Sequence, residues 1–139
     1  TFIITPVRVD GDSMKNTLKN GDILLLYKLS SINRFDIIVL DEEKDNEKII
    51  KRVIGLPGET VAIKKGKIYI NDKEIDDEYA YGETSDYNKV TLKDDEYFIL
   101  GDNRLISKDS RYFGPIKDNE IKGKIVFRLF PFTKIGTVQ

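Results

Sequence analysis

Hydrophobic residues along this chain come in short runs, and residues typical of turns separate them. The runs are about four to eight residues long and rich in Ile, Val, Tyr and Phe, a pattern that predicts β-strands. We expect strands at residues 2–9, 23–29, 36–41, 48–54, 59–64, 67–71, 96–101 and 124–131.

The stretches between these runs favour a mostly β fold with few helices. The clearest hairpin is "VAIKKGKIYIND", in which apolar residues flank the turn Lys65-Gly66. No long apolar period of about 3.6 residues occurs, so we expect only short helices, one turn after Ser13 and another near 110–113. Residues 72–95 are polar and acidic with aromatic patches, which predicts a small appendage or a long loop.

Length and composition narrow the choice of chemistry. A chain of 139 residues predicts a single domain, 1–139. The net charge of −1 gives no sign of nucleic-acid binding. The absence of His and Cys excludes a Ser-His-Asp triad, a Cys nucleophile and an ordinary zinc site. Catalysis must therefore use Ser, Thr, Lys, Tyr, Asp or Glu.

The stretch "VDGDSMKNTLKNGD" places Ser13 on a tight turn, where a nucleophile is often found. The elbow G-x-S-x-G fails because position 15 is Lys15, and S-x-x-K fails because position 16 is Asn16. A base for Ser13 must come from elsewhere in the fold. The alternative is a serine that only stabilises a turn or caps a helix.

A lysine can act as that base only when it is neutral, which needs burial among apolar side chains. Lys51 lies within "KIIKRVIGLPG", with Ile49 and Val53 on its own strand face, whereas most other lysines lie in turns or polar runs. Arg52 cannot serve, because guanidinium stays protonated in proteins. The alternative is a lysine on a strand edge that extends to water.

A third polar segment, "GDNRLISKDSRYFG", directly follows the apolar strand Tyr97–Leu100. Its carboxylates, guanidinium groups and hydroxyls can orient a site through hydrogen bonds and ion pairs. A well-capped loop with no role in catalysis is the other interpretation.

Taken together, these segments resemble the bacterial type I signal peptidases, membrane-anchored Ser-Lys proteases of the S26 family. The resemblance rests on "GDSMKNTLKNGD", "DIIVL", "KRVIGLPGE" and "GDNRLISKDSRYFG", in this order along nearly the whole chain. It implies antiparallel sheets in a partly open barrel, and a serine endopeptidase that needs no metal or organic cofactor.

The resemblance also assigns roles to residues. It makes Ser13 the nucleophile and Lys51 the general base, and it implies that Ser107 hydrogen-bonds the lysine. The supporting residues implied are Asp102, Asn103, Asp109 and Arg111. The implied substrate groove consists of Val7, Val9, Asp10, Gly11, Met14, Leu18, Ile49 and Ile50.

Two positions depart from the family pattern. Some relatives have a hydroxyl donor where this chain has Gly11, so its oxyanion hole would rely on the backbone N–H of Ser13 and on other backbone or water donors. Asn16 replaces a proline that is usual in the family, which predicts a softer turn.

The expected substrates are signal peptides of exported preproteins, cut after small residues in an Ala-x-Ala pattern, with pilin precursors left open as a dedicated substrate. Two alternatives stay open. One is a self-cleaving Ser-Lys protease of the SOS-repressor type, and the other is a non-catalytic pilus-assembly factor on the same fold.

The resemblance implies a catalytic domain on the extracytoplasmic face of the cytoplasmic membrane, tethered by a single-pass helix upstream of this sequence. An apolar surface would then touch lipid, although core packing explains the same residues equally well. The candidates for that surface are Phe2, Ile3, Ile4, Phe130 and Phe132.

Overall fold

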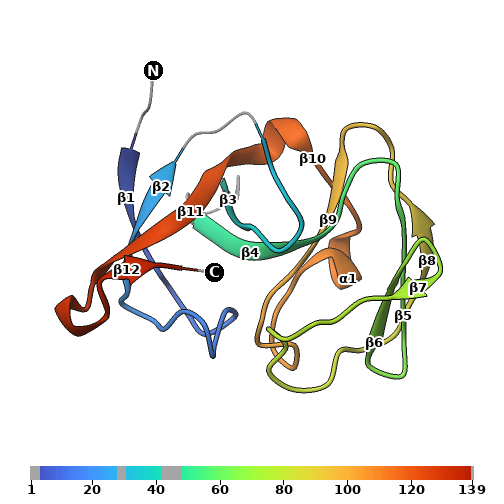
Figure 1. The fold of residues 1–139 in the computed structure, drawn as a ribbon, viewed down its shortest axis with the longest axis horizontal. Coiled ribbons are helices and arrows are strands. Elements are labelled where there is room, and N and C mark those ends of the chain that lie inside the picture. Colours follow the sequence, from blue (N-terminus) through green and yellow to red (C-terminus); the bar gives the residue numbers. More distant parts are fainter. Residues whose placement is uncertain (1–3, 28–30, 42–47, 139) are drawn as a thin grey trace.

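The computed structural model describes residues 4–27, 31–41 and 48–138. Strands dominate these residues and the helices are short, which confirms the predicted fold class of antiparallel sheets in a partly open barrel. Two sheets lie along the long axis of the molecule, with β12 towards one end and β8 towards the other (Figure 1). Within the described ranges, no helix is long and apolar enough to span a membrane.

The larger sheet has the strand order β1-β2-β11-β3-β4-β9-β10, and β12 pairs with β11. Each neighbouring pair in it is antiparallel. Its strands are β1 (Ile4–Arg8), β2 (Ile23–Tyr27), β3 (Ile37–Asp41), β4 (Lys48–Gly55), β9 (Glu96–Leu100), β10 (Ile116–Lys117), β11 (Ile121–Phe130) and β12 (Gly136–Thr137).

Strand β4 is the central element of the core. It pairs with β3 on one side and β9 on the other, and every residue from Ile50 to Gly55 is buried. A strand covered on both faces shows a continuous apolar run, and in β4 this run begins at Val53 and continues to its end at Gly55. Ile50, Val53 and Ile54 each belong to a different cluster of buried apolar side chains. Residues at this strand therefore sit where all parts of the core meet.

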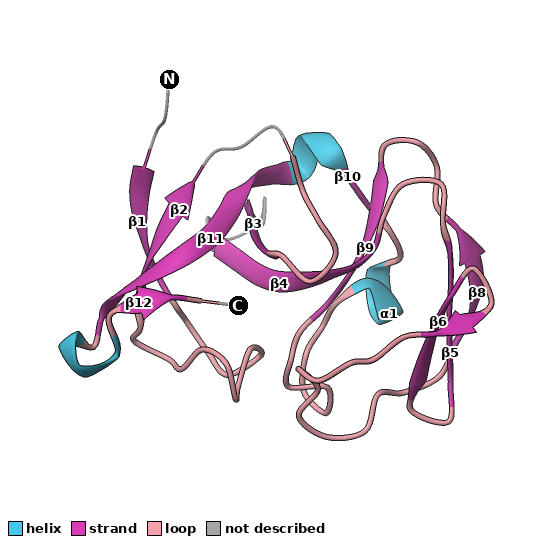
Figure 2. Cartoon of the chain, in the orientation of Figure 1, coloured by secondary structure: helices cyan, strands magenta, loops and turns pink. Residues whose placement is uncertain are grey.

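The smaller sheet has the order β7-β6-β5-β8. It confirms the hairpin predicted from the sequence, since β5 (Thr60–Lys64) and β6 (Lys67–Ile70) pair across Lys65-Gly66. Lys65 and Gly66 have φ values of 51° and 77°, the left-handed pair that a tight two-residue hairpin turn needs. The sheet is completed by β7 (Lys73–Glu74), labelled in Figure 1, and by β8 (Tyr87–Thr91), which Figure 2 shows beside β5 and β6.

The segment between β7 and β8, residues 75–86, runs back to the larger sheet, and we call it the strap. The side chain of Asp77 pairs with Arg104, whose Nη2 lies 3.1 Å from Asp77 Oδ1. The backbone N–H of Tyr81 donates to Asp102 O at 2.7 Å, and Arg104 N donates to Tyr81 O at 2.9 Å. Residues 72–95 thus combine two strands of the smaller sheet with a strap that contacts the segment Gly101–Gly114.

The predicted strands are all present within the described residues, although residues 2–3 and 28–29 lie outside them. The short strands β7, β10 and β12, and the polar strand β8, were not predicted, because two residues or a mostly exposed sequence show no apolar alternation. The helix near 110–113 is confirmed as α1 (Ser110–Phe113), and two 3₁₀ turns, η1 (Asp118–Glu120) and η2 (Phe132–Lys134), follow it. The helical turn expected after Ser13 was wrong: hydrogen-bonded turns stand there instead.

Candidate active site

Ser13 lies in the loop that joins β1 to β2, and burial of its neighbours fixes the shape of this loop. Met14 and Leu18 are 1% and 0% exposed, and Leu18 N donates to Met14 O at 2.9 Å. At the start of the loop, Gly11 has a φ of 91° and its N–H donates to Asn20 Oδ1 at 2.9 Å. The loop is thus held by two apolar anchors, and Ser13, directly before the first of them, stays partly exposed.

Lys51 lies in the middle of β4 with its ammonium group directed at Ser13. Its Nζ donates to Ser13 Oγ at 2.8 Å, and the residue is 5% exposed. Burial lowers the pKa of Lys51 from its ordinary value of 10.5 to about 8. The carboxylates of Asp109 and Asp102 oppose this by raising the pKa, and the guanidinium of Arg111 lowers it further.

This pair has the chemistry of a nucleophile and its base. With a pKa of about 8, roughly a tenth of the Lys51 side chains are neutral at pH 7. A neutral amine at this position, 2.8 Å from Ser13 Oγ, is within reach of the hydroxyl proton. A free lysine would be neutral about 300 times less often at this pH, so burial is what makes Lys51 usable as a base.

Asp109 and Arg111 form the ion pair that the resemblance implies. Arg111 Nε and Nη2 each donate to an Asp109 oxygen at 2.9 Å, and the Asp109 side chain is fully buried. Asp109 also accepts from the backbone N–H of Gly101 and caps α1 through Arg111 N. The Asp109 carboxylate therefore holds the end of β9 and the start of α1 together. Its negative charge is also close enough to raise the pKa of Lys51.

Asp102 forms a second ion pair, with Arg52, that the sequence did not reveal. Arg52 Nε and Nη2 donate to the two Asp102 oxygens at 2.9 and 2.7 Å, and both side chains are 0% exposed. Thr17 Oγ1 donates to the same carboxylate at 2.6 Å. The ring of Tyr79, from the strap, lies 3.6 Å from Arg52 Cζ, so the guanidinium stacks on an aromatic face.

Asp102 and Asn103 directly hold the loop that carries Ser13. Asn103 N donates to Ser13 O at 2.8 Å, and Asn103 Nδ2 donates to Asp12 O at 3.0 Å. Asp102 N points at Met14 Sδ at 3.3 Å. Three consecutive residues of the loop are thus contacted by two residues of the segment after β9, which keeps Ser13 in place opposite Lys51.

The hydrogen bond expected between Ser107 and Lys51 is absent from the structure. Ser107 is 2% exposed, and its Oγ has no hydrogen-bond partner among the described residues. The amine of Lys51 is directed to Ser13 instead. Ser107 does lie beside the nucleophile loop, since a Cβ added to Gly101 would meet Ser107 Oγ at 2.0 Å and Ser13 O at 2.7 Å. Gly101 is therefore the residue whose missing side chain lets these segments approach.

Ser13 and Lys51 open into a cavity of about 320 Å³. Of the predicted groove residues, the structure places Val9, Asp10, Met14, Ile49 and Ile50 along this cavity. Val7 and Leu18 instead belong to the buried core, and Gly11 is exposed outside the cavity lining. The sequence reasoning missed three lining residues, Lys48, Lys108 and Phe113.

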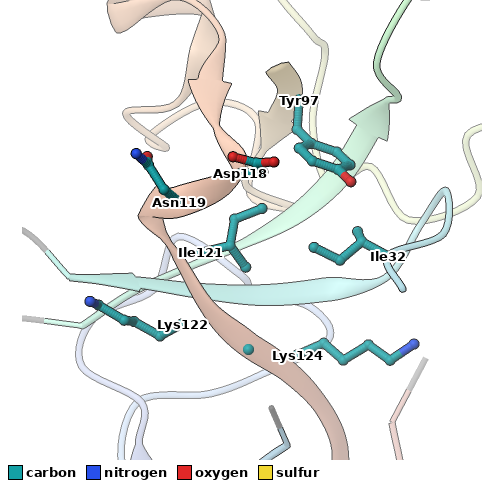
Figure 3. A pocket seen from close by; sticks show the side chains of 8 residues that line it. Ile32, Tyr97, Asp118, Asn119, Ile121, Lys122 and Lys124 are labelled. Atoms are coloured by element: carbon teal, nitrogen blue, oxygen red, sulfur yellow. The ribbon is translucent and has the colours of Figure 1, made fainter. Parts of the chain in front are cut away.

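A cavity of about 380 Å³ lies elsewhere, between η1, β11 and β9, and Figure 3 shows it. Its polar groups include Asp118, Asn119 and the hydroxyl of Tyr97. Among the described residues that line it there is neither a serine nor a buried lysine. The close pair of Ser13 and Lys51 therefore lies in the smaller cavity.

Residues 1–130 match the family model described as signal peptidase, peptidase S26. The chain belongs to the S26 signal peptidase family. It is 38% identical to signal peptidase I of Streptococcus pneumoniae serotype 4 (strain TIGR4), across 98% of this chain and 87% of that protein. It is 41% identical to signal peptidase I of Bacillus caldolyticus, across 97% of this chain and 84% of that protein.

A crystal structure of signal peptidase I from Enterococcus faecalis V583 shares the fold. It superposes with a TM-score of 0.61 and 34% identity, over 70% of this chain and 98% of that one. Membership of the S26 signal peptidases implies a serine peptidase, which agrees with a chain in which a serine and a buried lysine share a cavity.

Burial of Lys51 in this peptidase predicts a measurable cost in stability. Lowering its pKa from 10.5 to about 8 corresponds to about 3 kcal/mol, at about 1.4 kcal/mol for each pKa unit. Below pH 8 the amine is charged in both the folded and the unfolded chain, so the folded state carries the whole penalty. Between pH 8 and 10.5 the unfolded chain binds the extra proton, and the penalty fades.

Lys51→Met should therefore raise the free energy of unfolding at pH 6–7 by up to about 3 kcal/mol, and the gain should shrink as the pH rises towards 10.5. Urea unfolding at several pH values measures it. The exposed Lys117→Met is the matched control, with no such pH-dependent gain expected. A Lys51→Met variant less stable than the parent at pH 6 would contradict the assignment of a strained buried amine.

Proposed function

We propose that this protein is a serine endopeptidase that removes signal peptides from exported preproteins, with Ser13 as nucleophile and Lys51 as general base. The observation that carries the proposal is the 2.8 Å contact between Lys51 Nζ and Ser13 Oγ. It is supported by the burial that lowers the lysine pKa, and by the relatives named signal peptidase I.

In the proposed reaction, Ser13 Oγ attacks the carbonyl carbon of the scissile bond as neutral Lys51 takes the hydroxyl proton. The tetrahedral intermediate then collapses, Lys51 gives the proton to the leaving amine, and an acyl-enzyme remains. Water attacks the ester with Lys51 again as base, which releases the cleaved signal peptide and restores Ser13. Every proton passes through one nitrogen, so no second acid is needed.

The oxyanion of the intermediate would be stabilised by the backbone N–H of Ser13, aimed at charge that develops only after attack. Residue 11 is glycine and offers no side-chain hydroxyl for this purpose. The position of the Ser13 N–H then depends mainly on the position of its loop. The hydrogen bonds from Asn103 to Ser13 O and Asp12 O hold that loop.

Specificity for small residues at the first and third positions before the scissile bond fits the cavity walls. The aliphatic residues Val9, Ile49 and Ile50 line a space of about 320 Å³ together with Ser13. Branched side chains that protrude into a pocket leave room for Ala and exclude larger groups. An extended peptide would bind alongside the strands that carry these residues.

The relatives favour signal-peptide processing over the two alternatives. The similar proteins named above are signal peptidases, and a self-cleaving repressor is not among them. A non-catalytic assembly factor would not need to bury a lysine against a serine, because that burial lowers stability without a structural return. Pilin precursors remain a substrate to be tested in the same assay.

We further propose that the domain works at the extracytoplasmic surface of the cytoplasmic membrane, beside the anchor that the family resemblance implies. Its support is an apolar surface on β11 and the residues after it. Val126, Leu129, Phe130 and Ile135 are between 39% and 51% exposed. An apolar hollow beside them is lined by Leu25, Tyr27, Val126 and Phe127. Exposed apolar groups gathered in this way are typical of a lipid or protein contact.

Ser13→Ala and Lys51→Met should each lower kcat by at least about 100-fold, because each removes one half of the proton transfer. The measurement is cleavage of a peptide with alanine at the first and third positions before the scissile bond, followed by mass spectrometry. A pilin-derived precursor peptide is assayed in parallel, and Lys117→Met serves as the control with parental activity. Parental turnover by Ser13→Ala or Lys51→Met would refute the proposal.

The pH dependence of kcat/KM should report the Lys51 amine. Since only the neutral form accepts a proton, kcat/KM should fall about tenfold for each pH unit below about 8 and level off above it. A flat profile between pH 6 and 9, or one that falls as the pH rises through 8, would exclude Lys51 as the base.

Leu129→Glu should weaken binding to vesicles of phosphatidylglycerol and phosphatidylcholine, because it places a charge in the apolar surface. Thr91→Glu, on β8 towards the other end of the molecule (Figure 1), makes the same charge change and should bind as the parent does. Co-sedimentation measures both. Equal binding by the parent and Leu129→Glu would remove this surface from the proposal.

A further inference from the structure

The cavity beside Ser13 has charged groups that the proton transfer does not use. Besides Lys51, the charged residues in the described part of its lining are Lys48, Lys108 and Asp10. The chain as a whole has a net charge of −1. Lys108 is therefore a basic side chain of the cavity that has no part in the proton transfer.

Lys108 is directed to this cavity by the conformation of its segment. Ser107 and Asp109 on either side of it are buried, whereas Lys108 is exposed. Asp109 has extended backbone angles, φ −143° and ψ −158°. In an extended segment successive side chains point to opposite sides, so anchoring Ser107 and Asp109 inside turns Lys108 outward to the cavity.

Two carboxylates of the segment that carries Lys108, those of Asp102 and Asp109, are bound by other cations. Asp109 is bound by Arg111 at 2.9 Å, and Asp102 is bound by Arg52 at 2.7 Å. Within the described part of the chain, Lys108 has no hydrogen-bond or ion-pair partner. Its ammonium group is thus available to a ligand in the cavity, with a flexible stem that can reach it.

We propose that Lys108 is a specificity-determining residue that favours peptides with an acidic side chain close to the scissile bond. The inference rests on the proposed function, because it takes this cavity as the substrate site. The scissile bond must lie at Ser13 Oγ, and Lys108 lines the same cavity, so a carboxylate within a few residues of that bond meets an unpaired ammonium group. A solvent-exposed ion pair of this kind changes kcat/KM by about two- to fivefold.

The experiment uses a set of peptides with alanine at the first and third positions before the scissile bond. In each peptide a single Gln or Glu occupies one other position, from the fourth residue before the bond to the third after it. We expect the kcat/KM of the parent to be about two- to fivefold higher for the Glu peptide than for the Gln peptide at one or more positions. The preference should decline as ionic strength rises from about 0.05 to 0.5 M.

Variants at residue 108 assign the preference to this side chain. Lys108→Met should abolish the Glu preference, Lys108→Glu should reverse it, and Lys108→Arg should retain it. Lys117→Glu, an exposed change on β10 with the same change in net charge, should leave the preference intact. Because each result is a ratio of two peptides cleaved by one variant, general losses of activity cancel.

The two proposals fail in different ways. Gln peptides cleaved equally by the parent and by Ser13→Ala would overturn the proposed function. Gln peptides cleaved only when Ser13 is present, with a Glu-to-Gln ratio that is the same in the parent, Lys108→Met and Lys108→Glu, would overturn the role of Lys108 alone.

Discussion

The ion pair between Arg52 and Asp102 is the contact on which the other parts of this site depend. It is completely buried and joins β4 to the segment after β9, and Thr17 of the nucleophile loop donates to the same carboxylate. Removing one partner of such a pair would leave a buried charge, which typically costs about 3–5 kcal/mol. The pair therefore couples the position of the loop that carries Ser13 to the strand that carries Lys51.

Strand β4 serves both sides of this arrangement because successive side chains of a strand point to opposite faces. Lys51 contacts Ser13 on one face, and Arg52 contacts Asp102 and the ring of Tyr79 on the other. The two adjacent basic residues differ in their contacts. Arg52 donates to both oxygens of Asp102, whereas Lys51 Nζ contacts one hydroxyl among the described residues and its pKa is lowered to about 8. The Arg52–Asp102 ion pair and the Lys51 amine therefore lie on opposite faces of β4.

The sequence predicted what depends on local pattern and left out what depends on distant contacts. The long strands and the Lys65-Gly66 turn were visible as apolar runs and turn residues, and the absence of histidine led from Ser13 to Lys51. Two-residue strands such as β7 show no periodicity. The pairing of Arg52 with Asp102 spans 50 residues, and nothing in either segment identifies the other. The hydrogen bond expected from Ser107 to Lys51 was also beyond the sequence. The direction of the Ser107 hydroxyl depends on how its side chain packs over Gly101, a residue distant from Lys51 in the chain.

The composite origin of the site has a consequence for the timing of activity during folding. Ser13 and Lys51 are separated by 38 residues, and Ser13 O is held by Asn103 from near the other end of the chain. Contacts this distant in sequence form late, because the intervening chain must first be ordered. Until then Lys51 is in water with an ordinary pKa and is not held beside Ser13. The site is therefore assembled only when the core is complete, because its residues come from distant parts of the chain.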